Sequence, residues 1–519
     1  MRVLILEHPR LPSREHFNDI ANTPLWSCLM AGYTAAALQR AGVEAVLWDA
    51  RRRSFARVAE KLLAEPPDLL LVHAVYFWEP TPALFEFLAD LKARGFSAPL
   101  ALLGFFPTAA WAEILAACPA VDYILAGEPE ETAVDLALAL ARGEAPGGLG
   151  LAGRQAGEPR LPGLRPPVDP DLLAPPARPY LAQEDTVSVL ASRGCYNCCS
   201  FCLIPALNGN LSPWRGRRVE LIAEEVAGLA AAGKRDIYFV DPNFIGPGQR
   251  GRERTRELGR ALGELGVTFG MESRAQDLRP GLMEELAAQG LTSLLLGLES
   301  GSGEVLARLG KNSSVAANLA AIELVRRAGL EPEVGFIMFE RASTLGEVAA
   351  NLEFLREANL LDRLGRTANL LYHHQIALKG TGLYAQALAA GKLIPEGVVG
   401  FEGRLVYEDP RVAWLAGALR SLCLEVLRHM GRAEGTLYWS RERTLAEPFR
   451  SLNQFLVETF PRWLAWAGRW DGAPPAEAGA ALLAEGLAEA ARLAAATPAA
   501  PAPEPLVPVA DLAGGAARR

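Results

Sequence analysis

The sequence predicts an α/β protein with an N-terminal doubly wound Rossmann-like domain, a central partial (β/α)6 TIM-like barrel and a mainly helical C-terminal domain. Short apolar runs alternate with amphipathic stretches over residues 1–141 and again over 186–395, and after about residue 400 the pattern becomes helical. Regular alternation of strands and helices is typical of parallel sheets covered by helices. Half of the residues are apolar, which is ample for several cores.

The first domain is expected over residues 1–141. Its strands are predicted at Val3–Leu6, Ala45–Trp48, Leu69–Val72, Leu100–Leu103 and Tyr123–Ala126. Its helices are predicted at Leu29–Ala41, Phe55–Ala64, Ala83–Ala93, Ala109–Ala117 and Glu130–Ala141. Ligands of such sheets bind beyond the carboxyl ends of the strands, so the loops that follow the strands are candidate binding segments.

A connector is predicted between the first two domains. Residues 142–185 are rich in Gly and Pro, as at Pro146-Gly147-Gly148 and Pro175-Pro176. Such a segment forms neither a continuous helix nor a central strand. We therefore expect a linker that runs along a surface.

The central domain is expected over residues 186–395 as six β-α units. The strands are predicted at Thr186–Ala191, Asp236–Val240, Val267–Glu272, Ser293–Leu298, Glu333–Met338 and Ala368–Tyr372. The helices are predicted at Glu220–Ala232, Arg254–Leu265, Pro280–Gln289, Val305–Leu309, Ala316–Ala328 and Leu345–Glu357. Six such units fit an open TIM-like barrel with its site at the C-terminal mouth.

Residues 396–495 are expected to form a helical domain, and residues 496–519 a disordered tail rich in Ala and Pro. Helices are predicted at Arg411–Met430, Glu447–Gly468 and Ala476–Ala495. The second of them carries a row of aromatic residues that is either core or the wall of an apolar pocket.

Three cysteines, Cys195, Cys199 and Cys202, stand at C-x3-C-x2-C spacing directly after the first strand of the central domain. Three thiolates on one short loop suit an iron–sulfur cluster, whereas a tetrahedral zinc site needs a fourth ligand that the neighbourhood does not offer. Cys198 lies outside this spacing. The alternative is a set of structural cysteines, buried or in disulfides.

This loop, with Phe201 before its last cysteine, resembles the signature of the radical S-adenosylmethionine (SAM) superfamily. The resemblance implies a 4Fe–4S cluster on the three cysteines, whose open iron binds SAM and whose electron cleaves it to a 5′-deoxyadenosyl radical. It covers the whole central domain. It also implies SAM contacts from side chains or backbone at the strand ends, for which the candidates are Phe201, Asp241, Arg274, Glu299, Ser300, Gly335 and Ile337. For Asp241 and Arg274 a structural role is the open alternative.

Tyr372 and His373 end the predicted sixth strand. One of these side chains is a candidate acid, base or substrate contact. Neighbours on a strand point to opposite faces, so His373 and His374 are not expected to share a metal.

The first domain resembles the cobalamin-binding domain that precedes many radical SAM domains, most clearly in Val121–Thr132 and Pro24–Asp49. A corrin is wide, flat and partly apolar, and it needs glycines, backbone N–H groups and apolar side chains around it. The candidate contacts are Asn22, Thr23, Tyr76, Phe77, Trp78, Gly104, Phe105, Phe106, Gly127, Glu128, Pro129 and Glu130. His8 and His16 lack the Asp-x-His-x-x-Gly context of a cobalt ligand, so we expect no protein imidazole below the cobalt, and His73 is expected to be structural.

Together these resemblances imply a cobalamin-dependent radical SAM methyltransferase that transfers a methyl group from methylcobalamin to an unactivated carbon. Two alternatives remain open. The same cofactors serve ring formation or oxidation in cyclase-like members, and a corrinoid sensor or carrier would not cleave SAM. A methylthiotransferase is disfavoured, because neither its N-terminal cysteines nor its RNA-binding module is recognised.

The net charge of −8 argues against nucleic acid as the main partner. We expect a small-molecule or peptide substrate and a flavodoxin- or ferredoxin-type electron donor. Seven unevenly spaced cysteines do not suggest a disulfide framework, and neither a signal peptide nor a membrane span is recognised. A cytoplasmic location is therefore expected.

Overall fold

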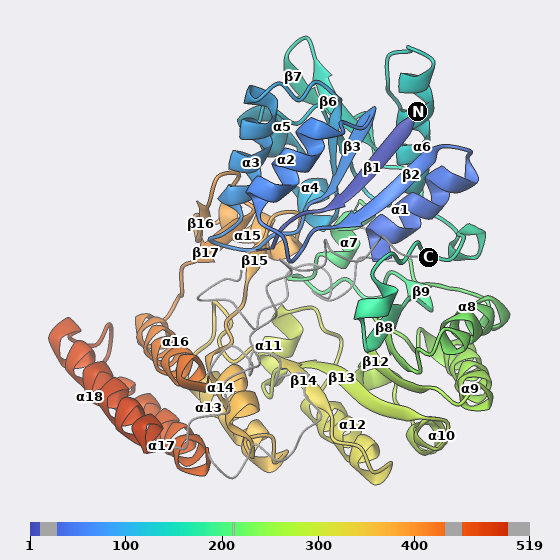
Figure 1. Ribbon diagram of the computed structural model, residues 1–519. Helices are drawn as coiled ribbons and strands as arrows, with labels where there is room; N and C mark the ends of the chain where they lie inside the picture. Colours follow the sequence, from blue (N-terminus) through green and yellow to red (C-terminus); the bar gives the residue numbers. More distant parts are fainter. Residues whose placement is uncertain (11–28, 210, 212, 431–448, 497–519) are drawn as a thin grey trace. The chain divides into compact units, whose positions relative to one another are not determined.

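The computed structural model describes residues 1–10, 29–209, 211, 213–430 and 449–496 (Figure 1). The chain divides into two compact units. The first comprises residues 1–299, 303–335 and 375–406, and the second comprises residues 300–302, 336–374 and 407–519. The first unit thus contains both the N-terminal domain and most of the central domain.

The N-terminal domain has a seven-stranded sheet in the order β2-β1-β3-β4-β5-β6-β7. Its five parallel strands are β1 (Arg2–Glu7), β2 (Glu44–Asp49), β3 (Leu69–His73), β4 (Leu100–Leu103) and β5 (Tyr123–Leu125). The order of these five is that of the flavodoxin-like doubly wound fold, whose ligand site lies where β1 and β3 meet. The five strands predicted from the sequence are confirmed.

Helices cover both faces of this sheet (Figure 1). Residues of α1 and α6 share a core with Val3 and Ile5, whereas residues of α2, α3 and α5 share a core with Leu4 and Leu6. Successive side chains of β1 thus point to opposite faces of the sheet, and both faces are buried under helices. The helices are α1 (Leu29–Arg40), α2 (Phe55–Ala64), α3 (Pro82–Ala93), α4 (Phe105–Ala109), α5 (Trp111–Ala117) and α6 (Glu130–Ala141).

The connector forms a hairpin that the sequence analysis did not predict. Strands β6 (Leu151–Gln155) and β7 (Glu158–Arg160) are antiparallel, and β6 pairs with β5 at the edge of the sheet. The short 3-10 helices η1 (Pro170–Leu172) and η2 (Leu181–Gln183) follow. Pro159 lies in β7, the outermost strand, where proline is tolerated because an edge strand leaves N–H groups outside the ladder.

The central sheet has the order β14-β13-β12-β11-β8. The strands are β8 (Thr186–Val189), β11 (Asp236–Phe239), β12 (Thr268–Arg274), β13 (Leu291–Glu299) and β14 (Glu333–Phe336), and the pairings among the first four are parallel. The chain also forms β9 (Ser192–Arg193), β10 (Arg215–Gly216) and η3 (Ala275–Asp277).

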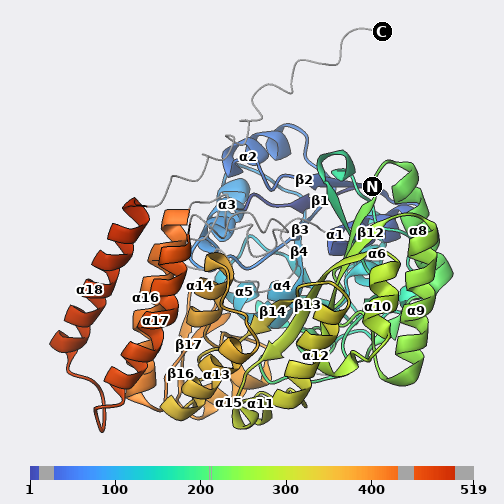
Figure 2. The same ribbon diagram turned by 90° about the horizontal axis from the view of Figure 1, so that it is seen from below.

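Helices α8 (Val219–Ala231), α9 (Gly248–Glu264), α10 (Leu282–Ala288) and α12 (Val315–Arg327) pack side by side along this sheet (Figure 2). Two shorter helices, α7 (Ile204–Leu207) and α11 (Gly303–Arg308), complete this part. Residues 375–406 add a small three-stranded sheet, β15-β17-β16, to the first unit. Its elements are β15 (Ala377–Leu378), α15 (Gly382–Ala389), β16 (Leu393–Glu396) and β17 (Glu402–Leu405).

The second unit is helical, with α13 (Leu345–Glu357), α14 (Leu364–Tyr372), α16 (Pro410–Met430), α17 (Arg450–Ala467) and α18 (Ala476–Ala495). Trp463 of α17 is buried, and Trp414 of α16 lies 6.0 Å from its ring and 4.5 Å from that of Trp466. These tryptophans therefore pack within the helical unit. The predicted start of α17 at Glu447 and nearly all of the predicted tail lie outside the described residues.

The predicted sixth strand at Ala368–Tyr372 is wrong. These residues end helix α14, and a single parallel bridge between Phe339 and His374 stands where a sixth strand would pair. A short, fully buried apolar run has the same composition in a helix and in a strand, so periodicity could not separate the two. Within the described residues, no helix is long and apolar enough to cross a membrane.

Candidate active site

The three cysteines lie on the loop that follows β8 and β9, past the carboxyl end of the first strand of the central sheet. Cys195, Cys199 and Cys202 are partly buried, whereas Cys198 is exposed. This is the strand-end position that the sequence predicts, and it separates Cys198 from the other three by exposure as well as by spacing.

The three thiols affect one another electrostatically. Burial, together with the charges of Cys199 and Cys195, raises the pKa of Cys202 to about 12. Burial also raises the pKa of Cys195, again with a contribution from Cys199. Thiolates this close repel each other, and bound iron cations would remove that penalty. The donor set thus fits a metal cluster.

A single metal ion fits less well. Among the described residues, no three His, Cys, Asp or Glu side chains are arranged to hold one ion. In a 4Fe–4S cluster each thiolate binds a different iron, so its ligands stand further apart than those of one ion.

The segment after α11, residues 309–312, holds the cysteine loop. Leu309 accepts a hydrogen bond from the backbone N–H of Ser200 at 2.9 Å. The Asn197 amide donates to the Gly310 carbonyl at 3.0 Å and to the Cys199 sulfur at 3.0 Å. Asn312 donates to the Asn197 side chain at 2.7 Å. We call residues 309–312 the clasp. Its role was not predicted, because it lies over a hundred residues from the cysteines in sequence.

Asp241 anchors the chain that leads into the loop. Its oxygens accept hydrogen bonds from the Ala191 N–H at 3.0 Å and from the Ser192 hydroxyl at 2.5 Å. Asp241 is fully buried, and burial raises its pKa to about 6. Asp241 was a candidate SAM contact, but both of its oxygens are engaged by the protein, so the structure favours the structural alternative.

Arg274, at the end of β12, lies near the cysteine loop. Its guanidinium carbon stands 4.8 Å from the ring centroid of Tyr196, and its Nη2 donates to the Lys311 carbonyl at 2.7 Å. The Tyr196 hydroxyl donates to Asp277, which also accepts from Asn243 at 2.9 Å. Arg274 therefore presents a fixed positive charge beside the cysteines, the charge that a SAM carboxylate requires.

Glu299, at the end of β13, pairs with Lys311 of the clasp at 2.7 Å. The residue has φ +67°, which is unusual outside glycine. A Cβ added at Gly297 would lie 2.7 Å from the Lys311 ammonium and 2.8 Å from the Glu299 carboxylate, so only glycine leaves room for this pair. Gly335, a candidate SAM contact on β14, also faces Glu299.

The same face of the sheet carries Glu272 and Tyr238, which the sequence analysis did not select. Glu272 is partly exposed and precedes Arg274 by two residues on β12, so both point to one face. Burial, with the charge of Asp241, raises the pKa of Glu272 to about 8. A carboxyl group that stays protonated near neutral pH is a candidate proton donor.

Ser300 and Ile337 belong to the second unit. The Ser300 hydroxyl donates to Asn351 at 2.6 Å, and the Asn351 amide donates to the Ile337 carbonyl at 3.4 Å. Asn351 thus joins these two candidate SAM contacts. Phe201 instead packs against a small core of residues 377–393 in the first unit.

Tyr372 and His373 stand at the end of α14 in the second unit, with ring centroids 5.5 Å apart. Arg420 of α16 lies 5.5 Å from the Tyr372 ring and 3.0 Å from the His374 ring nitrogen. The strand geometry assumed for these side chains is therefore wrong, and their candidate role as acid, base or substrate contact stays a prediction.

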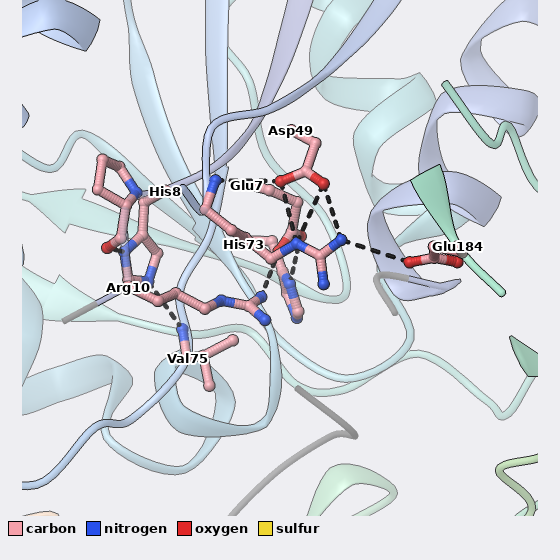
Figure 3. A network of polar contacts seen from close by, with 9 residues as sticks. Glu7, His8, Arg10, Asp49, His73, Val75 and Glu184 are labelled. Carbon is pink, nitrogen blue, oxygen red and sulfur yellow. Dashed lines mark hydrogen bonds and ion pairs between the residues drawn. The ribbon is translucent and has the colours of Figure 1, made fainter. Parts of the chain in front are cut away.

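The carboxyl ends of β1 and β3 meet in a buried ion-pair network (Figure 3). The Glu7 carboxylate bonds to His73 Nδ1 at 2.6 Å and also pairs with Arg10. Asp49, at the end of β2, pairs with Arg51 at 2.7 Å, which in turn reaches Glu184 at 3.5 Å. His73 therefore has the structural role that the sequence analysis assigned to it.

His8 lies in the same place but is held by the protein on both ring nitrogens. Its Nδ1 lies 2.7 Å from the Pro9 carbonyl, and its Nε2 lies 3.4 Å from the Val75 N–H. Burial lowers the pKa of His8 to about 3, so its ring is neutral. These contacts agree with the expectation that His8 is not a cobalt ligand, and His16 lies outside the described residues.

The aromatic loop after β3 is buried. The Tyr76 hydroxyl donates to Glu402 at 2.7 Å, and its ring packs 5.6 Å from Phe106 and 4.8 Å from Phe401. Trp78 has φ +49°. The Tyr76 and Trp78 rings lie 5.7 Å apart and share a core with Phe401, which lies far away in the sequence. The Phe77 N–H donates to Thr81 at 2.8 Å, and its ring lies near His8 and Arg10 instead.

Two glycine loops follow β4 and β5. Gly104 has φ +129°, and an added Cβ would lie 2.8 Å from the Ala74 carbonyl. Gly127 has φ +85°, and its N–H donates to Thr108 at 3.0 Å. Both positions require glycine, as a close backbone approach predicts. Phe105 is half-buried beside Gly104, and the candidates Asn22 and Thr23 lie outside the described residues.

Glu128 and Glu130 pair with arginines of the central domain. Glu128 binds Arg215 and accepts a hydrogen bond from the Val168 N–H at 2.6 Å, and Glu130 binds Arg193 at 2.6 Å. Burial opposes ionisation of Glu128, but hydrogen bonds and charges from the arginines hold its pKa below the usual value. These two glutamates join the N-terminal domain to the central domain within the first unit, and Pro129 between them is buried. A direct corrin contact from either carboxylate is therefore disfavoured.

Comparison with known proteins now identifies the class. Residues 189–355 match the family model described as the radical SAM superfamily. The 4′-phospho-dehydrooxetanocin synthase of Priestia megaterium is 30% identical over 193 residues, which are 33% of this chain and 26% of that protein. An uncharacterized methyltransferase of Pyrococcus horikoshii, PH0819, is 27% identical over 255 residues, 47% of this chain and 54% of the relative. The aligned segments thus span about a quarter and about half of these relatives.

Solved structures extend the likeness to the remaining parts of the chain. The cobalamin-dependent SAM radical enzyme OxsB, solved with aqua-cobalamin and SAM, matches 95% of this chain and 79% of its own at 17% identity and a TM-score of 0.75. The radical SAM methyltransferase TsrM from Kitasatospora setae, solved with cobalamin and a 4Fe–4S cluster, matches 89% and 100% at 15% identity and a TM-score of 0.63. Residues 189–355 thus match the radical SAM superfamily, in agreement with the resemblance of the central domain, and the chain has the fold of these two solved enzymes. The fold class predicted from the sequence is confirmed.

Proposed function

We propose that the protein is a cobalamin-dependent radical SAM methyltransferase that methylates an unactivated carbon of a small-molecule or peptide substrate. The observation that carries the proposal is the joining of two strand-end sites in one unit. The switch point of β1 and β3 and the cysteine loop after β8 both belong to the first unit, in which the pairs Glu128–Arg215 and Glu130–Arg193 join the segment after β5 to β10 and β9. Both sites therefore lie in one compact unit.

Cys195, Cys199 and Cys202 would hold a 4Fe–4S cluster, which when bound supplies one electron for SAM cleavage. Arg274 would hold the SAM carboxylate as a charge-assisted pair, since its guanidinium is fixed beside Tyr196 of the cysteine loop. Gly335 of the first unit would face the adenine, and Ile337 and Ser300, which belong to the second unit, stay candidate SAM contacts by resemblance. These residues bind and orient, and the buried surroundings exclude water.

Cobalamin would rest on the loops that follow β3, β4 and β5, and it supplies the methyl group when bound. Trp78, Phe77 and the half-buried Phe105 offer apolar contact, and Gly104 and Gly127 allow backbone approach. The neutral His8 ring is held by Pro9 and Val75, so the structure offers the cobalt no free imidazole from this residue. A flavodoxin- or ferredoxin-type protein would donate the electron.

The test begins with anaerobic reconstitution with iron, sulfide and hydroxocobalamin. Reduction in the presence of SAM should release 5′-deoxyadenosine, and methyl-labelled SAM should pass its label to a compound in a small-molecule and peptide extract. Deoxyadenosine without labelled product would favour the second candidate, ring formation or oxidation, which the likeness to a synthase supports. Cofactor binding without any deoxyadenosine would favour a corrinoid sensor or carrier.

A further inference from the structure

The clasp places one lysine beside the cysteine loop. Lys311 is buried, with 5% of its surface exposed, and its backbone neighbours hold the loop through Ser200 and Asn197. Arg274 fixes the Lys311 carbonyl at 2.7 Å. Lys311 therefore has little freedom to turn away from the site.

Lys311 lies directly beside the cysteine loop. The amide nitrogen of Asn197 lies 3.0 Å from the Cys199 sulfur and 3.4 Å from the Lys311 carbonyl. Because Lys311 is buried, solvent only weakly screens its charge from this loop.

Glu299 balances this charge at 2.7 Å. Its strained backbone, with φ +67°, and the missing side chain at Gly297 both serve to seat the pair. Strain at a non-glycine residue persists only where the surrounding structure enforces it. The sequence thus maintains a fixed cation beside the cysteines at some conformational cost.

We propose that Lys311 is a positioning residue that raises the reduction potential of the cluster and that Glu299 moderates the effect. This inference rests on the proposed function, since it requires a 4Fe–4S cluster on the three cysteines. A one-electron reduction adds negative charge to the cluster, and a nearby fixed cation stabilises the reduced form. Removing the cation makes reduction harder, and removing the balancing carboxylate makes it easier.

The experiment is a redox titration followed by electron paramagnetic resonance on the full chain, reconstituted anaerobically with iron and sulfide, without SAM. Lys311→Met keeps the apolar stem and removes the charge, and Lys311→Arg keeps the charge. Glu299→Gln removes the balancing charge, and Lys61→Met removes an exposed lysine on α2 as a control. We expect Lys311→Met to weaken reduction on the order of tenfold, equivalent to a fall of 59 mV for one electron.

Support requires a lower potential in Lys311→Met, a higher one in Glu299→Gln and values near wild type in Lys311→Arg and Lys61→Met. An unchanged potential in a fully loaded Lys311→Met protein overturns the inference. If Lys311→Met does not retain a cluster, the reduction potential of Glu299→Gln is the test. An unchanged potential in that variant also overturns the inference. Failure of the wild type to hold any cluster would instead refute the proposed function.

Discussion

At the carboxyl ends of β1 and β3, charged side chains pair with one another, whereas at the end of β8 the thiols are held by a clasp from elsewhere in the chain. Glu7 forms an ion pair with Arg10 and a hydrogen bond with His73. Cys195, Cys199 and Cys202 instead destabilise one another as thiolates. The charges at the first site are therefore balanced within the protein. The thiolates at the second site need bound cations to balance their charge.

This difference matches the two kinds of ligand. A corrin that needs no protein imidazole can bind through shape complementarity to the strand ends, where the charged side chains already pair with one another. A cluster supplies the charge that its ligands lack, so its binding is coupled to the order of the loop. Substitutions at the cysteine loop should therefore change the cluster content, whereas substitutions at the ends of β1 and β3 should change the folding stability.

Replacing a cluster ligand should have the largest effect. Cys199→Ala is expected to abolish the 4Fe–4S absorbance and iron content after reconstitution, because two thiolates cannot replace three. Cobalamin retention should remain, since the switch point lies on a separate sheet. Cys198→Ala is the matched control and should load normally. Loss of both cofactors in Cys199→Ala would contradict the separation of the two sites.

Breaking the buried network should come next. Glu7→Gln leaves His73 and Arg10 without their common anion, which is expected to cost about 3–5 kcal/mol of folding free energy. Calorimetry of the full chain would measure the loss. Asp49→Asn, in a partly exposed pair, should cost less, about 1 kcal/mol. Equal losses from the two variants would show that the network at the switch point is not the stabilising feature we infer.

The clasp offers a smaller and graded test. Asn197→Ala removes the hydrogen bonds to Gly310 and Cys199 and also the one accepted from Asn312, whereas Asn312→Ala removes only the last of these. Loss of these bonds should speed cluster removal by a chelator on the order of tenfold for Asn197→Ala and less for Asn312→Ala. The bleaching rate of the cluster absorbance measures this. Identical rates in wild type and Asn197→Ala would argue that the clasp does not hold the loop.

The last prediction concerns pH. Burial raises the folded-state pKa of Glu272 to about 8, above its value of 4.5 in the unfolded chain. Between these values the folded protein binds the extra proton, so stability is greatest below pH 4.5 for this group and falls as pH rises towards 8. Glu272→Gln should flatten that part of the apo-protein's pH–stability curve. A slope unchanged by the substitution would show that Glu272 ionises normally.

The sequence anticipated much of this arrangement because local signals carried it. The β-strands of the N-terminal domain and the cysteine triplet follow from periodicity and spacing. The clasp, the pairing of Glu128 and Glu130 with Arg215 and Arg193, and the packing of Phe401 against Tyr76 depend on contacts between distant segments. No local pattern encodes such contacts. The prediction of the sixth strand was wrong for a related reason. A short buried apolar run fits a helix or a strand equally well unless its neighbours in space are known.

The central claim is that one chain carries a cluster and a corrin at two strand-end sites of one unit. Anaerobic reconstitution followed by quantification of iron, sulfide and cobalamin in the same purified sample tests it most directly. We predict one 4Fe–4S cluster and one cobalamin per chain. A protein that loads the cluster but excludes cobalamin under these conditions, or that loads neither, would contradict the account.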